Sequence, residues 1–255
     1  MLSTVSHRAF YVWYRNVLSY QRYVWSTFIA SFGEPLLYLI SMGLGMGSYM
    51  GLINGQSYLQ FIAPGLVVSS CMSAATYECC FSAFSRMHIE KIYDSQLITP
   101  ISVGDIVTGE ILWGITRSML SGFVLCIILA AFGLIHSPWA LLYPLLWILV
   151  GYVFSTMGML MTSYAQMFDF FTFYIELWVM PSFFFSGIFF PLDHMPQFVQ
   201  WISMALPLTQ AVQLSRALIT GHLHLALLGS VVFLIVWGTA FYLWALQRMQ
   251  QRLIV

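Results

Sequence analysis

SMLSGFVLCIILAAFGLIHSPWALLYPLLWILVGYVFSTMGMLMTSYAQMF, residues 118–168, contains no Asp, Glu, Lys or Arg. A helix that spans a bilayer needs about 20 mostly apolar residues, so this stretch is long enough to cross a membrane twice. The break between two crossings falls at GLIHSP, residues 133–138, which ends in a proline. The stretch therefore predicts two membrane-spanning helices joined by a short hairpin loop.

The rest of the chain has the same character. Uncharged runs cover residues 35–77, 195–215 and 225–247, and the first is broken at GSYMGLINGQS, residues 47–57. Only 7% of the residues are charged and 60% are hydrophobic, with a mean hydropathy of +0.84. Soluble domains carry about 25% charged residues. So few charges cannot cover a water-facing surface, and we expect lipid to face most of the chain.

These runs predict an all-α polytopic membrane protein, folded as a single domain over residues 1–255. We expect six transmembrane helices, at about 24–47, 58–84, 105–134, 139–164, 170–190 and 225–246. Residues 1–23 are polar and aromatic, which predicts an interfacial helix. Between spans five and six, residues 191–222 are apolar but interrupted by Pro191, Pro196 and Pro207. This pattern predicts short re-entrant helices that dip in from the outer side.

The positive charges predict the orientation, because short cytoplasmic loops retain Lys and Arg. Seven of the nine fall on one side of the six-span arrangement: Arg8, Arg15, Arg22, Arg86, Lys91, Arg248 and Arg252. We expect that side to be the cytosol, with both termini inside. Arg117 lies within span three, and Arg216 is the exception on the outer side. No cleavable signal peptide is evident.

Catalytic motifs are missing from the sequence. Lys91 is its single lysine and follows Glu90, which excludes the phosphate-binding GxxxxGK[ST] loop. Neither a GxSxG elbow nor an HExxH pair occurs, so we expect no enzyme, no bound cofactor and no metal site. His222 and His224 form a lone HxH, which is more often a solvated loop than a metal site. The four cysteines fall within the predicted spans, and we expect free thiols in packed helices.

Ionisable side chains inside the spans are functional candidates, because burying a charge in hydrocarbon costs at least ~2.5 kcal/mol. The candidates are Glu34, Glu78, Glu110, Arg117 and Glu176. Glu110 and Arg117 are seven residues apart and share a helix face, about 10 Å apart along the axis. That spacing favours a network shared with Glu78 or Glu176. Such a network could hold helices together or take part directly in transport. Asp105, near the start of span three, could instead cap that helix.

RMHIEKIYDSQLITPIS, residues 86–102, is a charged island that joins spans two and three. Arg86, Glu90, Lys91 and Asp94 offer polar contacts, whereas Ile89, Ile92 and Tyr93 can form one apolar edge. Pro100 marks the end of the island, just before the chain enters the membrane again. The simplest interpretation is a solvated loop retained as a topology anchor.

Three stretches resemble the ABC-2 type permeases, the membrane subunits of bacterial ATP-driven exporters. PLDHMPQFVQWISMALPLTQAVQLSRALITG, residues 191–221, resembles their signature segment, with Pro207, Leu208 and Arg216 at the matching places. MSAATYECCFSAFSRM (72–87) and GDIVTGEILWGITRSML (104–120) resemble the branch that exports nodulation factors, which are lipo-chitooligosaccharides. That branch tends to carry lysine where this chain has Arg117, so the charge is kept.

The resemblance implies a role for the charged island. In such permeases the link between spans two and three is a coupling helix that sits in a cleft of a separate ATPase subunit. The residues implied in ATPase coupling are Arg86, Ile89, Glu90, Lys91, Tyr93 and Asp94. The resemblance also implies a homodimer in the bacterial inner membrane with two ATPase subunits beneath it, which hold the ATP and Mg²⁺. The expected substrate is an amphiphile such as a lipo-oligosaccharide, a polysaccharide-lipid or a drug, and no nucleic-acid partner is expected.

Two other classes of function remain open. A proton-coupled secondary transporter would use Glu34, Glu78, Glu110 or Glu176 as a proton relay and would work without any ATPase. An intramembrane enzyme would need catalytic groups that converge at one depth, and the sequence shows no such cluster.

Overall fold

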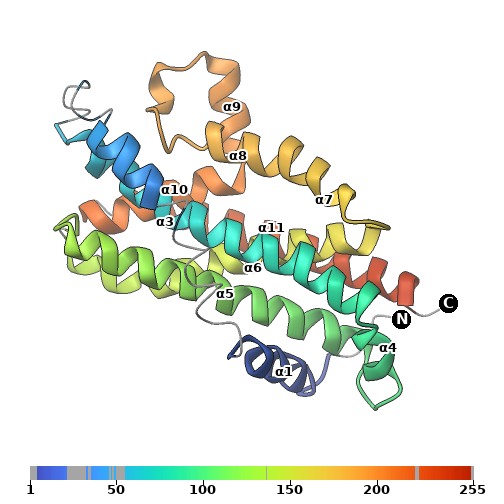
Figure 1. Cartoon of the computed structure of the whole chain (residues 1–255). Helices are drawn as coiled ribbons and strands as arrows, with labels where there is room; N and C mark the ends of the chain where they lie inside the picture. The colour runs from blue at the N-terminus through green and yellow to red at the C-terminus, as the bar shows by residue number, and fades with distance from the viewer. Residues whose placement is uncertain are drawn as a thin grey trace.

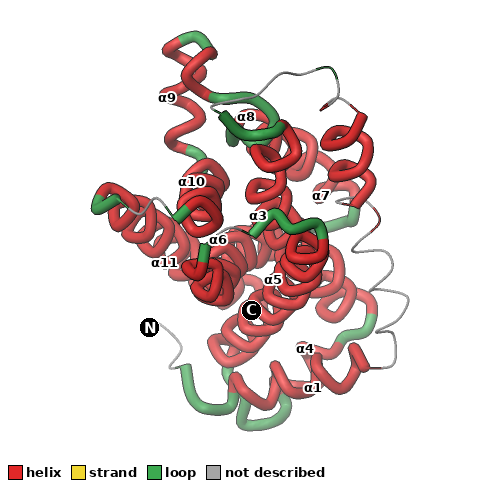
Figure 2. The backbone as a smooth tube through the Cα atoms, turned by 90° about the vertical axis from the view of Figure 1, so that its left-hand side faces the viewer, coloured by secondary structure: helices red, strands yellow, loops and turns green. Residues whose placement is uncertain are grey.

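The computed structural model describes residues 5–21, 33, 36–45, 47, 49, 55–135, 137–221 and 224–253, and in these residues the regular elements are helices (Figure 2). The α-helices are α1 (Ala9–Gln21), α3 (Tyr58–Tyr77), α4 (Ile92–Leu97), α5 (Val103–Ala131), α6 (Tyr143–Tyr164), α7 (Asp169–Tyr174), α8 (Met180–Phe185), α9 (Gln197–Ala205), α10 (Pro207–Thr220) and α11 (Ala226–Leu253). Wider π turns form η1 (Leu39–Gly45), η3 (Glu78–Ser82), η4 (Ser85–Ile89) and η6 (Ile175–Val179), and 3-10 turns form η5 (Pro138–Leu142) and η7 (Leu192–His194).

Four helical segments are long and apolar enough to cross a membrane. They run over Tyr58–Ile89, Val103–Ala131, Pro138–Tyr164 and Ala226–Leu253, at the places expected for spans two, three, four and six. The expected span five is helical from Asp169 to Phe185 through α7, η6 and α8, but is not one of these four segments. Much of the expected span one, including Glu34, lies outside the described residues. A polytopic helical protein is thus confirmed, and a total of six spans stays a prediction.

The bundle is centred on α6, which packs against α3, α5 and α11 (Figure 1). Small residues let these helices approach closely, as in other membrane bundles. A Cβ added at Gly114 of α5 would lie only 2.7 Å from Cys79 Sγ of η3 and would also clash with Ser155 of α6. By contrast, α11 leaves Leu228, Val232 and Val236 exposed, as a helix facing lipid does.

The cysteines are free thiols, as expected. Cys71, Cys79 and Cys80 are buried among the helices, and Cys126 is half-buried. They therefore act as small apolar packing residues.

Helix α1 lies along α5 and packs against it (Figure 1). Ala9 and Val12 are buried against Gly109 of α5, where an added Cβ would lie 2.6 Å from Val12 Cβ and 2.7 Å from the Ala9 carbonyl oxygen. On its other side, α1 exposes aromatic and aliphatic side chains such as Tyr11 and Leu18. A helix within residues 1–23 is confirmed, and its place at a membrane interface remains a prediction.

The N-terminal segment, the charged island and the end of α11 lie toward the same end of the bundle (Figure 1). The Arg8 guanidinium donates a hydrogen bond to the Pro100 carbonyl, and Arg252 donates one to the Thr162 carbonyl at 2.7 Å. This end gathers most of the positive charges that the sequence assigned to one side, although Arg22 lies outside the described residues.

Asp105 helps to cap the start of α5, which is one of the two roles that its position in the sequence left open. Its backbone N–H donates to Ser102 Oγ at 3.1 Å, and its carboxylate accepts the Ser102 N–H at 3.0 Å. This reciprocal pair is a capping box. A further bond from the Ser6 N–H to Asp105 Oδ1, at 2.6 Å, attaches the N-terminal segment to the same helix.

Within the expected re-entrant segment, the described residues 191–221 form short helices, each of which begins at or just after a proline. Pro191 and Pro196 precede η7 and α9, and Pro207 is the first residue of α10. Proline suits the first turn of a helix because its missing N–H needs no partner there. While α9 is largely exposed, α10 is largely buried and packs against α3 and α11. Arg216 of α10 donates to the Gly187 carbonyl at 2.6 Å and lies over the Phe61 ring at 4.0 Å.

Candidate functional site

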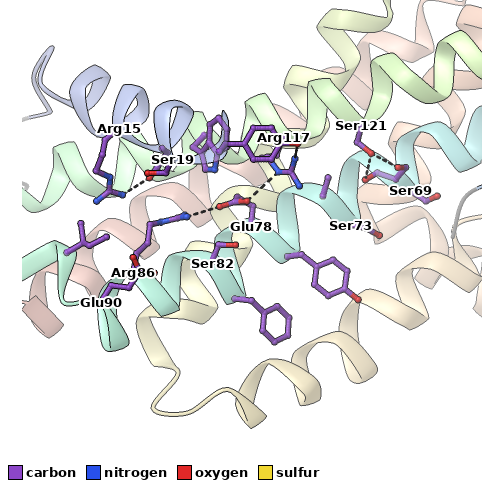
Figure 3. A pocket seen from close by; sticks show the side chains of 18 of the residues that line it. Arg15, Ser19, Ser69, Ser73, Glu78, Ser82, Arg86, Glu90, Arg117 and Ser121 are labelled. Atoms are coloured by element: carbon purple, nitrogen blue, oxygen red, sulfur yellow. Dashed lines mark hydrogen bonds and ion pairs between the residues drawn. The ribbon is translucent and has the colours of Figure 1, made fainter. Parts of the chain in front are cut away.

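Arg86 is the centre of a buried group of ion pairs between the helices (Figure 3). Its NH1 lies 2.9 Å from Glu78 Oε1, its NH2 lies 2.6 Å from Glu110 Oε2, and its Nε donates to Glu110 Oε1 at 3.2 Å. The Arg86 guanidinium therefore donates two parallel hydrogen bonds to Glu110 and a third to Glu78. Two-pronged bonds of this kind fix the geometry of both partners.

Two further arginines flank this centre. Arg117 Nε lies 3.4 Å from Glu78 Oε2, and Arg15 NH2 lies 3.3 Å from Glu110 Oε1. We call the five residues Arg15, Glu78, Arg86, Glu110 and Arg117 the ion-pair cluster. It joins α1, η3, η4 and α5, so movement of any of these elements would change its contacts.

Partners outside the cluster hold the two flanking arginines. The Arg117 guanidinium donates to Tyr20 Oη at 2.5 Å and lies over the Tyr20 ring at 4.5 Å. Asn16 Nδ2 donates to Glu110 Oε2 at 3.1 Å, beside Arg15. Burial lowers the pKa of Arg15 from its ordinary value, and Glu110 offsets part of that effect. Arginine remains charged at neutral pH.

Two π turns, η3 and η4, carry Glu78 and Arg86 at the end of the long helix that begins with α3. Glu78 begins η3 and Arg86 lies within η4. On a regular α-helix, side chains three or four residues apart are neighbours, whereas these two are eight apart and still form an ion pair. Wider turns with i→i+5 bonds are common at functional sites, and here they separate the two charged residues.

A cavity of about 990 Å³ opens beside the cluster (Figure 3). Glu78, Arg86 and Arg117 form part of its wall. Serine hydroxyls line it at Ser19, Ser69, Ser70, Ser73, Ser82 and Ser121. Aromatic rings line it at Tyr20, Tyr38, Tyr77, Phe81, Trp113 and Phe183. The cavity therefore combines a charged wall with hydroxyl groups and apolar rings.

The charged island presents an exposed tip next to this site. Ile89 is 62% exposed and Ile98 is 89% exposed, and Glu90, Lys91 and Asp94 are exposed as well. Lys91 has φ 54°, a left-handed conformation that is uncommon outside glycine, and it turns the chain from η4 into α4. We call residues 88–98 the tip.

Not every residue expected at a partner surface faces outward. Tyr93 is 0% exposed, and Arg86 points into the ion-pair cluster. Burial raises the pKa of Tyr93 well above its ordinary value, and the nearby Glu110 raises it further. Ile92, predicted on the apolar edge, lines the cavity instead. These three residues therefore attach the tip to the helical bundle.

The intramembrane candidates meet only in part. Glu78, Glu110 and Arg117 belong to one network, as their spacing predicted. Glu176 is exposed on η6, away from the cluster, and Glu34 lies outside the described residues. From the sequence, Arg15 was expected only as one of the positive charges that set the topology. The buried contact of Arg15 could have been predicted from its neighbour, because Asn16 is a second polar residue on a helix that is otherwise mostly aromatic and aliphatic.

No group of three His, Cys, Asp or Glu side chains is placed to hold a metal ion within the described ranges. The described residues also show no evident cofactor site. Several helices long and apolar enough to cross a membrane, a cavity of mixed polarity and an exposed charged tip place the described residues in the class of polytopic membrane proteins.

Comparison with known proteins identifies the family. Residues 7–220 match the family model of the ABC-2 type transporter, and the chain belongs to this family. It is thus a multi-pass permease of the inner membrane that works with a separate ABC ATPase subunit, and it is not itself an enzyme.

Several relatives support this assignment. Nodulation protein J of Rhizobium leguminosarum bv. trifolii is 37% identical over 213 residues, which cover 83% of this chain and 80% of that protein. Nodulation protein J of Rhizobium meliloti (strain 1021) is 33% identical over 212 residues, covering 82% and 80%. Inner membrane transport permease YadH of Escherichia coli (strain K12) is 27% identical over 241 residues, covering 92% of each chain.

Proposed function

We propose that this permease exports an amphiphile, such as a lipo-oligosaccharide, a polysaccharide-lipid or a drug, and that ATP hydrolysis drives it through the tip. Two copies of the chain pair around a central path. Two ATPase subunits, which hold the ATP and Mg²⁺, bind beneath them. The similarity to nodulation proteins J and to a transport permease supports this assignment.

One observation carries the coupling proposal. The tip exposes Ile89 and Ile98 at its surface, while Arg86 and Tyr93 of the same short segment are rooted in the bundle. Exposed apolar side chains that lie among charged ones can offer a partner protein both apolar and polar contacts. A push on the tip would therefore reach Arg86 directly, and through Arg86 it would reach Glu78 and Glu110.

The proposed topology places the tip and both termini in the cytoplasm. Six spans cross the membrane, α1 lies in the inner interface, and residues 191–222 form the re-entrant region outside. The grouping of Arg8, Lys91, Arg248 and Arg252 toward one end of the bundle supports this orientation. The proposed coupling residues are of two kinds. Ile89, Glu90, Lys91 and Asp94 contact the ATPase at the surface, and Arg86 and Tyr93 connect the tip to the bundle.

Co-purification tests the coupling surface. Tagged permease is isolated in mild detergent with its ATPase, and variants Ile89→Asp and Lys91→Glu are compared with Phe198→Asp. Phe198 is 63% exposed on α9 and makes a matched control, because it is an exposed apolar residue far from the tip. We expect the tip variants to retain at least about tenfold less ATPase, since a buried charge without a partner weakens an interface by 1.4 kcal/mol or more.

The control variant should retain the wild-type amount of ATPase. If both tip variants keep the ATPase and still transport substrate, the coupling proposal is wrong. Transport that persists after the ATPase is removed would instead favour the proton-coupled alternative, in which Glu78 or Glu110 relays protons.

A further inference from the structure

We propose that the cavity binds an oxyanion, such as a phosphate, sulfate or carboxylate, at Arg117, and that this oxyanion is the head group of the transported amphiphile. The second half of this statement rests on the proposed function. The binding itself does not depend on it, and it can be measured without ATP or transport.

The ion-pair cluster has an excess of positive charge. It contains three guanidinium groups, from Arg15, Arg86 and Arg117, and two carboxylates, from Glu78 and Glu110. Arg86 is hydrogen-bonded to both carboxylates, and each carboxylate also pairs with one flanking arginine, Glu110 with Arg15 and Glu78 with Arg117. Because three guanidinium groups share two carboxylates, one positive charge is left over, and the flanking arginines, which each have one carboxylate partner, carry most of it. An excess charge in a low-dielectric site favours a bound counter-ion.

Arg117 is the flanking arginine that can receive this counter-ion. Its side chain is only 10% exposed and lines the cavity. Its buried Nε forms an ion pair with Glu78 Oε2 at 3.4 Å, but among the described residues this Nε makes no hydrogen bond. A buried donor of this kind is costly unless a ligand or water completes it.

The other negative side chain of the cavity lies away from Arg117. Figure 3 shows Glu90 at the Arg86 end, whereas Arg117 lies toward Ser69, Ser73 and Ser121. Glu90 accepts a bond from Ser85 Oγ at 3.2 Å, which holds it at that end. Repulsion between Glu90 and a bound oxyanion is therefore smallest at Arg117.

Hydroxyl groups around Arg117 can complete the coordination of an oxyanion. Ser70 Oγ and Ser121 Oγ lie 2.5 Å apart in a hydrogen bond, and Ser69 and Ser73 lie on the same stretch of α3. A hydroxyl group can rotate to donate toward an acceptor that enters the cavity. An arginine with several serines is a common environment for phosphate or sulfate, because both supply donors and neither supplies negative charge.

The rest of the cavity favours a head group attached to an apolar body over a free ion. Tyr77 stacks on Phe81 with ring centroids 5.6 Å apart, and Tyr38 lies 5.8 Å from Phe183. All four rings line the cavity. Its volume of about 990 Å³ matches the upper end of small-molecule pockets, roughly 300–1,000 Å³, which is enough for a head group and the start of its apolar chain.

A titration of the intact permease–ATPase complex tests the proposal. The probes are dihexanoyl phosphatidic acid, dihexanoyl phosphatidylcholine and inorganic phosphate, and binding is measured by calorimetry in neutral detergent without ATP. We expect phosphatidic acid to bind at least about tenfold more tightly than either other probe, because only it joins an unshielded anion to an apolar body.

Variants locate the site. Arg117→Gln should weaken the binding of phosphatidic acid about tenfold or more, and Arg117→Lys should restore most of it. Arg248→Gln removes an exposed charge at the cytoplasmic end and should change nothing. Should Arg117→Gln fail to fold, Ser73→Asp offers a second test, since it breaks no ion pair and places a competing carboxylate in the cavity.

Each result decides the proposal. Equal binding of the three probes, or full binding by both Arg117→Gln and Ser73→Asp, would overturn oxyanion binding at Arg117. Phosphate that binds as tightly as phosphatidic acid would overturn the assignment to an amphiphile. These outcomes are distinct from failure of the coupling proposal, because Arg117→Gln should still co-purify with the ATPase.

Discussion

Replacing Arg86 by methionine removes the central charge of the ion-pair cluster while keeping an apolar stem of similar length. Three contacts disappear, two to Glu110 at 2.6 and 3.2 Å and one to Glu78 at 2.9 Å. Glu110 is 0% exposed, and of its carboxylate's partners among the described residues it would keep Arg15, at 3.3 Å, and Asn16. Breaking a buried ion pair on one side costs about 3–5 kcal/mol, because the partner charge is left uncompensated. We expect a loss in that range.

The free energy of unfolding can be followed by SDS titration in mixed micelles. The double variant Arg86→Met with Glu110→Leu removes both charges, so its loss should be smaller than the sum of the single losses by about 0.5–3 kcal/mol. Arg248→Met is the matched control. Arg248 is exposed and lies over the Tyr164 ring at 4.7 Å, so its loss should cost no more than about 1 kcal/mol.

Two results would contradict this reasoning. A loss below about 1 kcal/mol for Arg86→Met would mean that water or another group replaces the arginine at little cost. Strict additivity in the double variant would mean that Arg86 and Glu110 are not energetically coupled, despite the two bonds between them.

Two further substitutions probe the packing around the site. Gly109→Ala places a Cβ 2.6 Å from Val12 Cβ and should cost about 1–3 kcal/mol, detaching α1 so that proteolysis within it becomes faster. Gly229→Ala on α11 meets nothing within 4 Å and should leave that cleavage rate unchanged, whereas equal rates for the two variants would contradict a close seat for α1. Tyr143→Phe removes a hydroxyl that lies 2.7 Å from Ser215 Oγ and should lower the free energy of unfolding by about 1 kcal/mol; an unchanged value would mean that this bond contributes nothing.

Local features of the chain were sufficient to predict much of the architecture. The uncharged run at 118–168 gave two of the four membrane-crossing helices because a span depends mainly on length and apolarity. Ser102 and Asp105 are three residues apart, and their capping box needs no distant partner. The network of Glu78, Glu110 and Arg117 was also predictable, since carboxylates and a cation buried in hydrocarbon must find one another.

Tertiary packing decides which side chains of the charged island are buried and which are exposed. Arg86 and Lys91 are only five residues apart on the same charged island, yet Arg86 pairs with Glu78 and Glu110 while Lys91 is exposed at the tip. The π turns η3 and η4 change the helical phase between Glu78 and the island, and a pattern that assumes 3.6 residues per turn cannot anticipate that change.

The site itself also needed the fold. Arg15 reaches Glu110 across 95 positions of sequence because Gly109 lets α1 lie close to α5. Serines from α1, α3 and α5 line one cavity because α1 and α3 both pack against α5. Composition and spacing determine that the helices exist and which stretches enter the membrane. Only the approach of their surfaces decides which charges meet, because that approach depends on packing between residues far apart in the chain.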